Sequence, residues 1–334
     1  MKFGPVPVAD AAGSLLAHGL KRGELVFRKG RVLSAQDVAA LQGEGVHEVI
    51  VAQLQPDDVH EDEAAQQLAA ALCGAGARCS EATTGRANVL ALAPGLAQVD
   101  AARIDAINAV HESLTVATLP PFEPVAAGQM LATIKVIPYA VPRAALQQAL
   151  RLAAGASPAL GVATFAPLRV ALALTRLSDT RAAVLAKMRD AVDKRLVPLH
   201  SPLVAEAVVA HEVAALAEVL RSWSAQGEAD VLLISGIAAT VDREDVVPAA
   251  IVAAGGQVLH AGMPVDPGNL LVLGQLQGRP VVGLPTCARS PKLNGFDFVL
   301  RRLVARLPVG AAEVMQMGVG GLLTEIPTRP MPRG

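Results

Sequence analysis

The amino-acid sequence predicts an α/β protein in two parts. Residues 1–160 are expected to form an N-terminal, strand-rich α+β region that can divide into two small subdomains. Residues 161–334 are expected to form a three-layer domain around a mainly parallel sheet, followed by a C-terminal tail. Three observations support this division: a length of 334 residues, a stretch from Ala154 to Pro158 rich in small residues and proline, and a regular alternation of strand-like and helix-like segments after it.

The N-terminal region combines short apolar runs with amphipathic segments. A helix flanked by two strands is predicted in the order Glu24–Phe27, Gln36–Leu41 and Glu48–Val51. Ser34 is a suitable start for that helix. An Ala-rich helix is predicted over Glu61–Leu72, and residues 113–141 are rich in strands that prolines and a glycine interrupt.

After the Ala154–Pro158 stretch, buried strands alternate with helices of about ten residues or more. The predicted strands are Leu168–Leu174, Val231–Ile234, Leu270–Leu276 and Pro280–Leu284. The predicted helices are Ala182–Leu196, His211–Ser224, Val246–Ala254 and Phe296–Leu307. This alternation favours a mainly parallel sheet that helices cover on both faces.

Composition argues against several classes of partner. The formal net charge is −1 with dispersed Lys and Arg, and aromatic residues make up 2 %, so neither a basic stripe nor a base-stacking groove for nucleic acid is expected. Charged or turn residues interrupt every apolar stretch before the roughly 18 residues that a membrane span requires. The first residues carry prolines and an aspartate where a secretory signal would be apolar. We therefore expect a cytoplasmic protein that binds neither nucleic acid nor membranes.

The cysteines and histidines do not form a recognisable framework. Cys73, Cys79 and Cys287 are odd in number and show neither a CxxC pair nor a histidine at zinc spacing, and the seven histidines are scattered. No disulfide and no structural metal site is predicted.

Loops at the carboxyl ends of parallel strands are the expected place for a ligand. The first such loop runs from Thr175 to Thr180, where the hydroxyls of Thr175 and Ser178 precede a helix. These hydroxyls are candidate ligand-binding groups, and capping of the following helix is the alternative.

The second loop runs from Ser235 to Asp245 and enters a helix. Its small residues present backbone N–H groups suited to a phosphate, which makes Ser235, Gly236 and Thr240 candidate binding residues. Asp242 and Asp245 are the candidate catalytic residues because a carboxylate there can accept amino or hydroxyl protons from a ligand. The alternative is a capped helix with solvated acids.

The third loop runs from Pro285 to Gly295 and contains the candidate binding residues Thr286, Arg289 and Ser290. Ser290 is expected to cap a helix with Pro291 at its first position, so that free N–H groups and nearby positive charge form an anion pocket.

Two further features of this third loop depend on its surroundings. The positive charge is expected to lower the pKa of the Cys287 thiol, although a lone cysteine is more often an inert core residue. Arg289 has an alternative role as an ion-pair partner of Asp266 or Asp297.

A double turn from Ala261 to Asn269 separates the second and third loops. Its prolines and glycines fix the backbone ahead of the next strand, and Asp266, Gly268 and Asn269 are candidate binding residues on the same crevice.

Several of these segments resemble known sequence motifs. Asp245–Ala250 matches the Asp-Val-x-Pro-x-Ala segment of molybdopterin adenylyltransferases, and Ser235-Gly236 matches the start of their glycine-rich loop. On these residues the C-terminal half resembles the molybdopterin-binding domain that these enzymes share with molybdopterin molybdenumtransferases.

A narrower resemblance is to a bacterial group of uncharacterised molybdopterin-binding proteins. It rests on Val241–Arg243, Gly262–Leu271, Cys287–Lys292, Asn294–Asp297 and Met317–Leu323. Residues 108–142 also resemble that group, some members of which carry a cytidylyltransferase-like domain. The chain departs from the enzymes at Ile237–Ala239, where they keep glycines or a serine, and at Thr286, which replaces a glycine, so that binding is favoured over catalysis.

The resemblance implies a protein that binds molybdopterin or the molybdenum cofactor in cofactor biosynthesis, handling or delivery. Its ligand would be a pterin or a nucleotide, its protein partner a molybdoenzyme or a cytidylyltransferase, and its assembly a homo-oligomer. Two alternatives stay open. One is an active, Mg²⁺-dependent transferase of cofactor synthesis, with Asp242 and Asp245 holding the metal or orienting a nucleotide. The other is a nucleotide pyrophosphohydrolase of the competence-damage type, which shares this fold.

Overall fold

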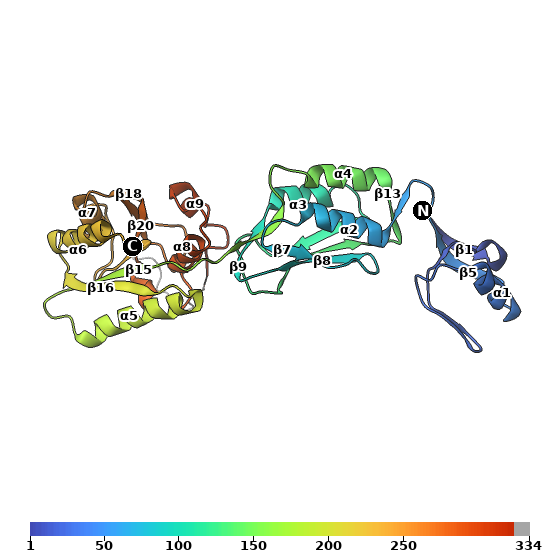
Figure 1. The fold of residues 1–334 in the computed structure, drawn as a ribbon, viewed down its shortest axis with the longest axis horizontal. Coiled ribbons are helices and arrows are strands. Elements are labelled where there is room, and N and C mark those ends of the chain that lie inside the picture. The colour runs from blue at the N-terminus through green and yellow to red at the C-terminus, as the bar shows by residue number, and fades with distance from the viewer. Residues whose placement is uncertain (324–334) are drawn as a thin grey trace, which may run out of the picture. The chain divides into compact units, whose positions relative to one another are not determined.

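A computed structural model describes residues 1–323, which belong to two compact units, Met1–Thr164 and the residues from Phe165 onward (Figure 1). Both units mix helices and strands, so the α/β class is confirmed. Part of the predicted C-terminal tail, residues 324–334, lies outside the described residues. No helix within residues 1–323 has the length and apolar character needed to cross a membrane.

The first unit begins with a small antiparallel sheet and one helix. Its elements are β1 (Lys2–Pro7), β2 (Leu15–Leu16), β3 (Leu20–Arg22), β4 (Leu25–Phe27), α1 (Ala35–Gly43) and β5 (Glu48–Gln53), with sheet orders β1-β5-β2 and β3-β4. Helix α1 starts at the predicted Ser34, whose hydroxyl accepts the N–H of Asp37 at 3.1 Å. The Arg31 guanidinium lowers the pKa of Asp37 to about 2.

The rest of the first unit packs three helices against antiparallel sheets. Its helices are α2 (Glu61–Leu72), α3 (Ala101–Asn108) and α4 (Arg143–Ala153). Its strands are β6 (Asp58–His60), β7 (Ala77–Cys79), β8 (Arg86–Ala91), β9 (Gly95–Val99), β10 (Leu114–Thr118), β11 (Pro124–Val125), β12 (Met130–Val136), β13 (Ala140–Pro142) and β14 (Leu160–Thr164). The Ala154–Pro158 stretch is the turn between α4 and β14, and β14 pairs with β9 inside this unit.

The second unit contains a six-stranded sheet in the order β16-β15-β17-β20-β19-β18. Its strands are β15 (Val170–Arg176), β16 (Leu203–Ala210), β17 (Val231–Ser235), β18 (Gln257–Ala261), β19 (Val272–Leu276) and β20 (Arg279–Gly283). Three of the five pairings are parallel, and the two that involve β19 are antiparallel. The mainly parallel sheet is therefore confirmed.

Helices cover both faces of this sheet because its strands are apolar on both sides. The helices are α5 (Ala182–Leu196), α6 (Val213–Gln226), α7 (Val246–Ala253), α8 (Gly295–Val304) and α9 (Ala311–Met315). Alternate strand residues go to opposite faces: Leu172 and Leu233 share a buried cluster with α5 and α8, whereas Ala173 and Leu232 share another with α6 and α7. The two clusters lie on opposite faces of the sheet, between it and the helices that cover each face.

Two strands of the sheet are absent from the sequence-based prediction. Strands β16 and β18 lie at the two edges, and the residues of β16 alternate between half-buried and exposed along its length. Strand β18 is antiparallel to β19, and the short turn Gln277–Gly278 then joins β19 to β20 with both residues at positive φ, 48° and 78°. Such a turn matches the right-handed twist of a hairpin.

Candidate functional site

Four loops reach the same edge of the six-stranded sheet. Strands β15, β17 and β20 are parallel neighbours, so the loops after Arg176, Ser235 and Gly283 leave from one edge. Strand β18 runs in the same direction because two antiparallel pairings separate it from β20, and the turn that follows Ala261 therefore joins the same edge. This is the edge at which ligands of open α/β sheets bind.

The peptide unit between Gly236 and Ile237 is held on both sides. The Ile237 N–H donates to the hydroxyl of Thr175 at 2.9 Å, and that threonine is fully buried at the end of β15. On the other side, Nη2 of Arg289 donates to the carbonyl oxygens of Gly236 and Ile237, both at 2.6 Å. Three predicted binding residues, Thr175, Gly236 and Arg289, are thus brought together around one peptide.

Arg289 carries a positive charge that no carboxylate within residues 1–323 neutralises. Its hydrogen bonds go to two neutral carbonyls, and burial alone accounts for the lowered pKa of its guanidinium. Its Nε is buried and has no hydrogen-bond partner in the described chain. The alternative prediction, an ion pair with Asp266 or Asp297, is therefore wrong. A half-buried arginine that has an N–H without an acceptor is suited to bind an anion.

The start of helix α8 differs from the prediction. Residues Thr286–Arg289 form a single 3-10 turn that ends at Ser290, and α8 begins only at Gly295. The N-cap is Asn294, whose side chain accepts the N–H of Phe296 at 2.9 Å. Asp297 in turn accepts the Asn294 N–H at 2.8 Å, which completes a reciprocal cap that Ser290 and Pro291 cannot make. The prediction of Ser290 as the helix cap is wrong.

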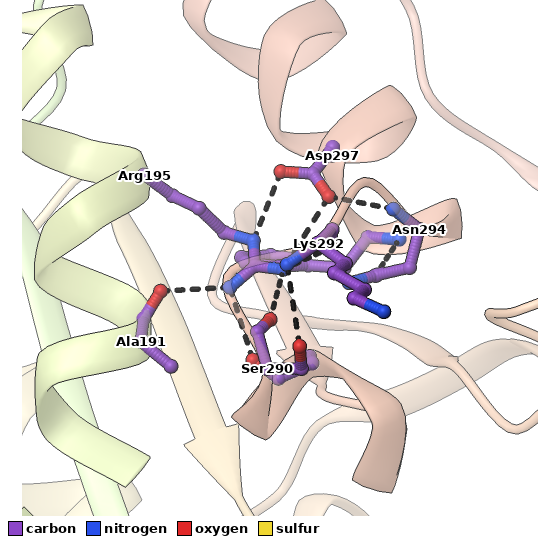
Figure 2. A network of polar contacts seen from close by, with 8 residues as sticks. Ala191, Arg195, Ser290, Lys292, Asn294 and Asp297 are labelled. Atoms are coloured by element: carbon purple, nitrogen blue, oxygen red, sulfur yellow. Dashed lines mark hydrogen bonds and ion pairs between the residues drawn. The ribbon is translucent and has the colours of Figure 1, made fainter. Parts of the chain in front are cut away.

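Arg195, at the end of α5, holds this third loop in place (Figure 2). Its side chain is 5 % exposed, and its Nε lies 2.9 Å from Oδ1 of Asp297. Its two terminal nitrogens donate to four carbonyl oxygens, those of Ala191, Ala288, Ser290 and Lys292, at 2.7–3.0 Å. A buried cation with a carboxylate and four carbonyls is fully paired, which fixes the backbone next to Arg289.

His211, which follows strand β16, is a second residue that the prediction missed. Its Nδ1 lies 2.9 Å from the Thr175 hydroxyl, which also accepts the Ile237 N–H. Burial lowers the pKa of His211, and the nearby Asp245 carboxylate partly opposes this shift. This role could not be predicted, because strand β16, which ends just before His211, was not predicted either.

The two candidate catalytic acids fold the second loop onto itself. Oδ2 of Asp245 accepts the N–H groups of Val241 and Asp242 at 2.6 and 3.0 Å, and Oδ1 of Asp242 accepts the Glu244 N–H at 2.8 Å. The hydrogen bonds from the N–H groups of Val241 and Asp242 lower the pKa of Asp245. Within residues 1–323, no three His, Cys, Asp or Glu side chains are grouped so that they could hold a metal ion.

The other predicted residues occupy the same edge with differing exposure. Ser235 is buried, Thr240, Thr286 and Asp266 are half-buried, and Ser178 and Asn269 are exposed. The Asn269 side chain donates to the carbonyl of Met263 at 3.3 Å and so closes the double turn.

The double turn packs tightly against the start of α8. Gly268 has φ +145°, and a Cβ on it would lie 2.6 Å from the backbone nitrogen of Gly295, so only glycine permits this approach. The Gly295 N–H donates to the Pro267 carbonyl at 2.9 Å. The second and third loops and this turn therefore form one connected surface.

The environment of Cys287 differs from the prediction. Burial raises the pKa of its thiol and outweighs the Arg195 guanidinium, which lowers it. The expectation that nearby positive charge would leave this pKa lowered is therefore wrong. The thiol is therefore protonated at neutral pH and a poor nucleophile.

One family model and several solved structures are similar to this chain. A family model described as a domain of unknown function (DUF8806) matches residues 5–53. No curated protein matches. Among solved structures, the molybdopterin biosynthesis protein MoeA from Pyrococcus horikosii is similar with a TM-score of 0.31 and 13 % identity, over 91 % of this chain and 75 % of that chain.

Two further solved structures are each similar to less than half of this chain. The molybdopterin biosynthesis enzyme MoaB from Thermus thermophilus has a TM-score of 0.28 and 14 % identity, over 42 % of this chain and 98 % of that chain. The protein CinA, of unknown function, from Thermoplasma acidophilum has a TM-score of 0.24 and 14 % identity, over 36 % of this chain and 90 % of that chain. Likeness at this level establishes neither fold nor function.

Proposed function

We propose that the protein binds molybdopterin or the molybdenum cofactor at the carboxyl edge of the six-stranded sheet, and that it acts in the biosynthesis, handling or delivery of that cofactor. The observation that carries the proposal is the charge of Arg289. This guanidinium donates to two carbonyls, has no carboxylate partner in residues 1–323, and its Nε–H has no acceptor there. An anion such as the phosphate of a pterin would supply both the negative charge and the acceptor.

The pterin part of the proposal rests on the sequence resemblance of these loops to molybdopterin-binding proteins. The geometry of the acids favours binding over catalysis, because Asp242 and Asp245 already accept backbone N–H groups of their own loop. A residue that is engaged in this way organises a loop well but is poorly placed to act on a substrate.

The experiment is a measurement of pterin in the purified full-length protein. The protein is denatured, any released pterin is oxidised to its fluorescent derivative, and molybdenum is measured on the same sample. We expect pterin in the wild type and a strongly reduced amount in Arg289→Ala. Arg169→Ala, which removes an exposed arginine at the opposite edge of the sheet, is the matched control and should retain pterin. Turnover of ATP, CTP or molybdate without bound pterin would contradict the proposal and favour an enzyme.

Asp245→Ala is expected to weaken ligand binding while the melting temperature changes little. The carboxylate is not part of the core, but it holds the N–H groups of Val241 and Asp242 and so shapes the loop. Calorimetric titration and thermal melting of the same samples test this, with Asp245→Asn as the variant that keeps an acceptor oxygen. A large fall in melting temperature with unchanged affinity would show that Asp245 is structural only.

We also propose that the protein forms a homo-oligomer. The edge strand β16 leaves Val204 and Val208 38 % and 45 % exposed, which adds to an apolar content of 52 %. Light scattering at micromolar concentration should give a mass that is a multiple of 34.3 kDa. A monomeric mass would reject this expectation without affecting the proposed ligand.

A further inference from the structure

The hydroxyl of Thr175 makes two polar contacts, one with the Ile237 N–H and one with His211. It accepts the Ile237 N–H, which can only donate, and its second contact is Nδ1 of His211 at 2.9 Å. Thr175 is fully buried, and its hydroxyl has no further hydrogen-bond partner within the described chain. When the imidazole is neutral with its own proton on Nε2, Nδ1 accepts the hydroxyl proton and both contacts of the hydroxyl are satisfied.

Protonation of the imidazole would disturb this arrangement. A protonated Nδ1 becomes a donor, so that the Thr175 oxygen would accept two N–H groups while its own proton loses its acceptor in a buried place. Charged residues near His211 include Arg176 at the end of β15, Glu212 ahead of α6, Asp245 ahead of α7 and Arg289, which donates to the Gly236 carbonyl. Burial disfavours the cation more strongly than the Asp245 carboxylate favours it.

The same hydroxyl acts on the Gly236–Ile237 peptide, whose other side Arg289 holds. Rotation of that peptide would break the bond to Thr175 and the bond from Arg289 to the Gly236 carbonyl together, because the two groups lie on opposite sides of one planar unit. His211 also lies beside the peptide, since a Cβ on Gly236 would be 4.0 Å from Cε1 of its ring.

We propose that His211 is a positioning residue of the ligand site: with a neutral imidazole it directs the Thr175 hydroxyl, which fixes the Gly236–Ile237 peptide in the orientation that Arg289 binds. Its effect on ligand affinity rests on the proposed function, whereas its effect on the peptide does not. The affinity of the site for its anion is then lower when His211 is protonated. The Gly236–Ile237 peptide is no longer fixed in the orientation in which its carbonyl accepts the Arg289 guanidinium.

The first measurement uses the ligand-free, full-length protein. Hydrogen exchange of the Ile237 amide is expressed as a protection factor between about pH 5 and 8, the range in which histidine titrates. In the wild type we expect protection to fall by roughly 5-fold, the effect of about one hydrogen bond, as pH decreases through that range. His211→Phe, which has no acceptor, should show the low value at every pH.

Two variants separate positioning from a merely structural role. His211→Asn keeps an acceptor near the place of Nδ1 but does not titrate, so its protection should be high at every pH. His200→Asn is the matched control. His200 is exposed and precedes β16, so it lies at the opposite end of that strand from His211. Its φ of 52° is one that asparagine tolerates. Its profile should equal that of the wild type. Equal protection in the wild type and His211→Phe, or an equal pH profile in the wild type and His211→Asn, would overturn the proposal.

The second measurement is calorimetric titration of the same proteins with a pterin monophosphate and with inorganic phosphate. We expect affinity to follow the exchange data, so that His211→Phe binds several-fold more weakly and His211→Asn loses the pH dependence. If the wild type binds neither probe while the exchange pattern holds, the proposed function fails and the peptide-positioning role stands. If every variant binds the probe equally and exchange is unchanged, the role of His211 fails and the proposed function stands.

Discussion

Replacing Arg195 with methionine is expected to destabilise the folded protein by about 3–5 kcal/mol, because the change leaves the carboxylate of Asp297 buried without its cation. The arginine side chain is 5 % exposed and that of Asp297 is 11 % exposed, so solvent cannot replace the lost partner readily. Four carbonyl oxygens lose their donors as well. Urea or guanidinium unfolding, followed by a signal from the second unit, measures the effect.

Two comparisons identify the origin of this loss. Arg189→Met, on the same helix, removes an exposed arginine that pairs with Asp193 and Glu206 and should cost less than about 1 kcal/mol. The double change Arg195→Met with Asp297→Asn removes both charges, keeps an acceptor oxygen for the Asn294 N–H and should recover part of the loss. If Arg195→Met unfolds at the same denaturant concentration as the wild type, the buried network contributes nothing to stability.

Arg289→Ala is expected to reduce affinity for a pterin monophosphate by roughly 10- to 100-fold, which corresponds to the loss of a charge-assisted hydrogen bond. Arg289→Lys should restore only part of that affinity, because an ammonium is a point charge without the planar fork that reaches two carbonyls and an anion together. Calorimetric titration at two salt concentrations measures both effects, and Arg169→Ala serves as the control. Equal affinities for all four proteins would leave Arg289 as a structural residue only.

Elements governed by local sequence were predicted well. Helices α2 and α5 have the predicted bounds, because a periodic apolar face is a local property of the sequence, even though α5 has no side-chain cap. The edge strands β16 and β18 were missed since a strand depends on its neighbour, and the alanines in β16 carry little strand preference of their own.

The residues of the site illustrate the same limit. The prediction correctly placed Thr175, Gly236 and Arg289 near one another because parallel strands bring their carboxyl ends to one edge. It could not choose between two competing helix starts after β20, since that choice depends partly on Arg195, which is 102 positions away from Asp297. The partners of His211 and Arg289 are likewise remote in sequence, and periodicity contains no information about them.

The hairpin between β19 and β20 has a practical consequence. Its turn, Gln277–Gly278, lies at the opposite edge of the sheet from the four loops, because β19 runs against β20. A fluorophore on a cysteine introduced at Gln277, or a short affinity peptide inserted beside it, would not cover the four loops of the proposed ligand site. Such a handle would allow immobilisation of the protein for surface-based binding measurements with the ligand-facing edge oriented toward solution.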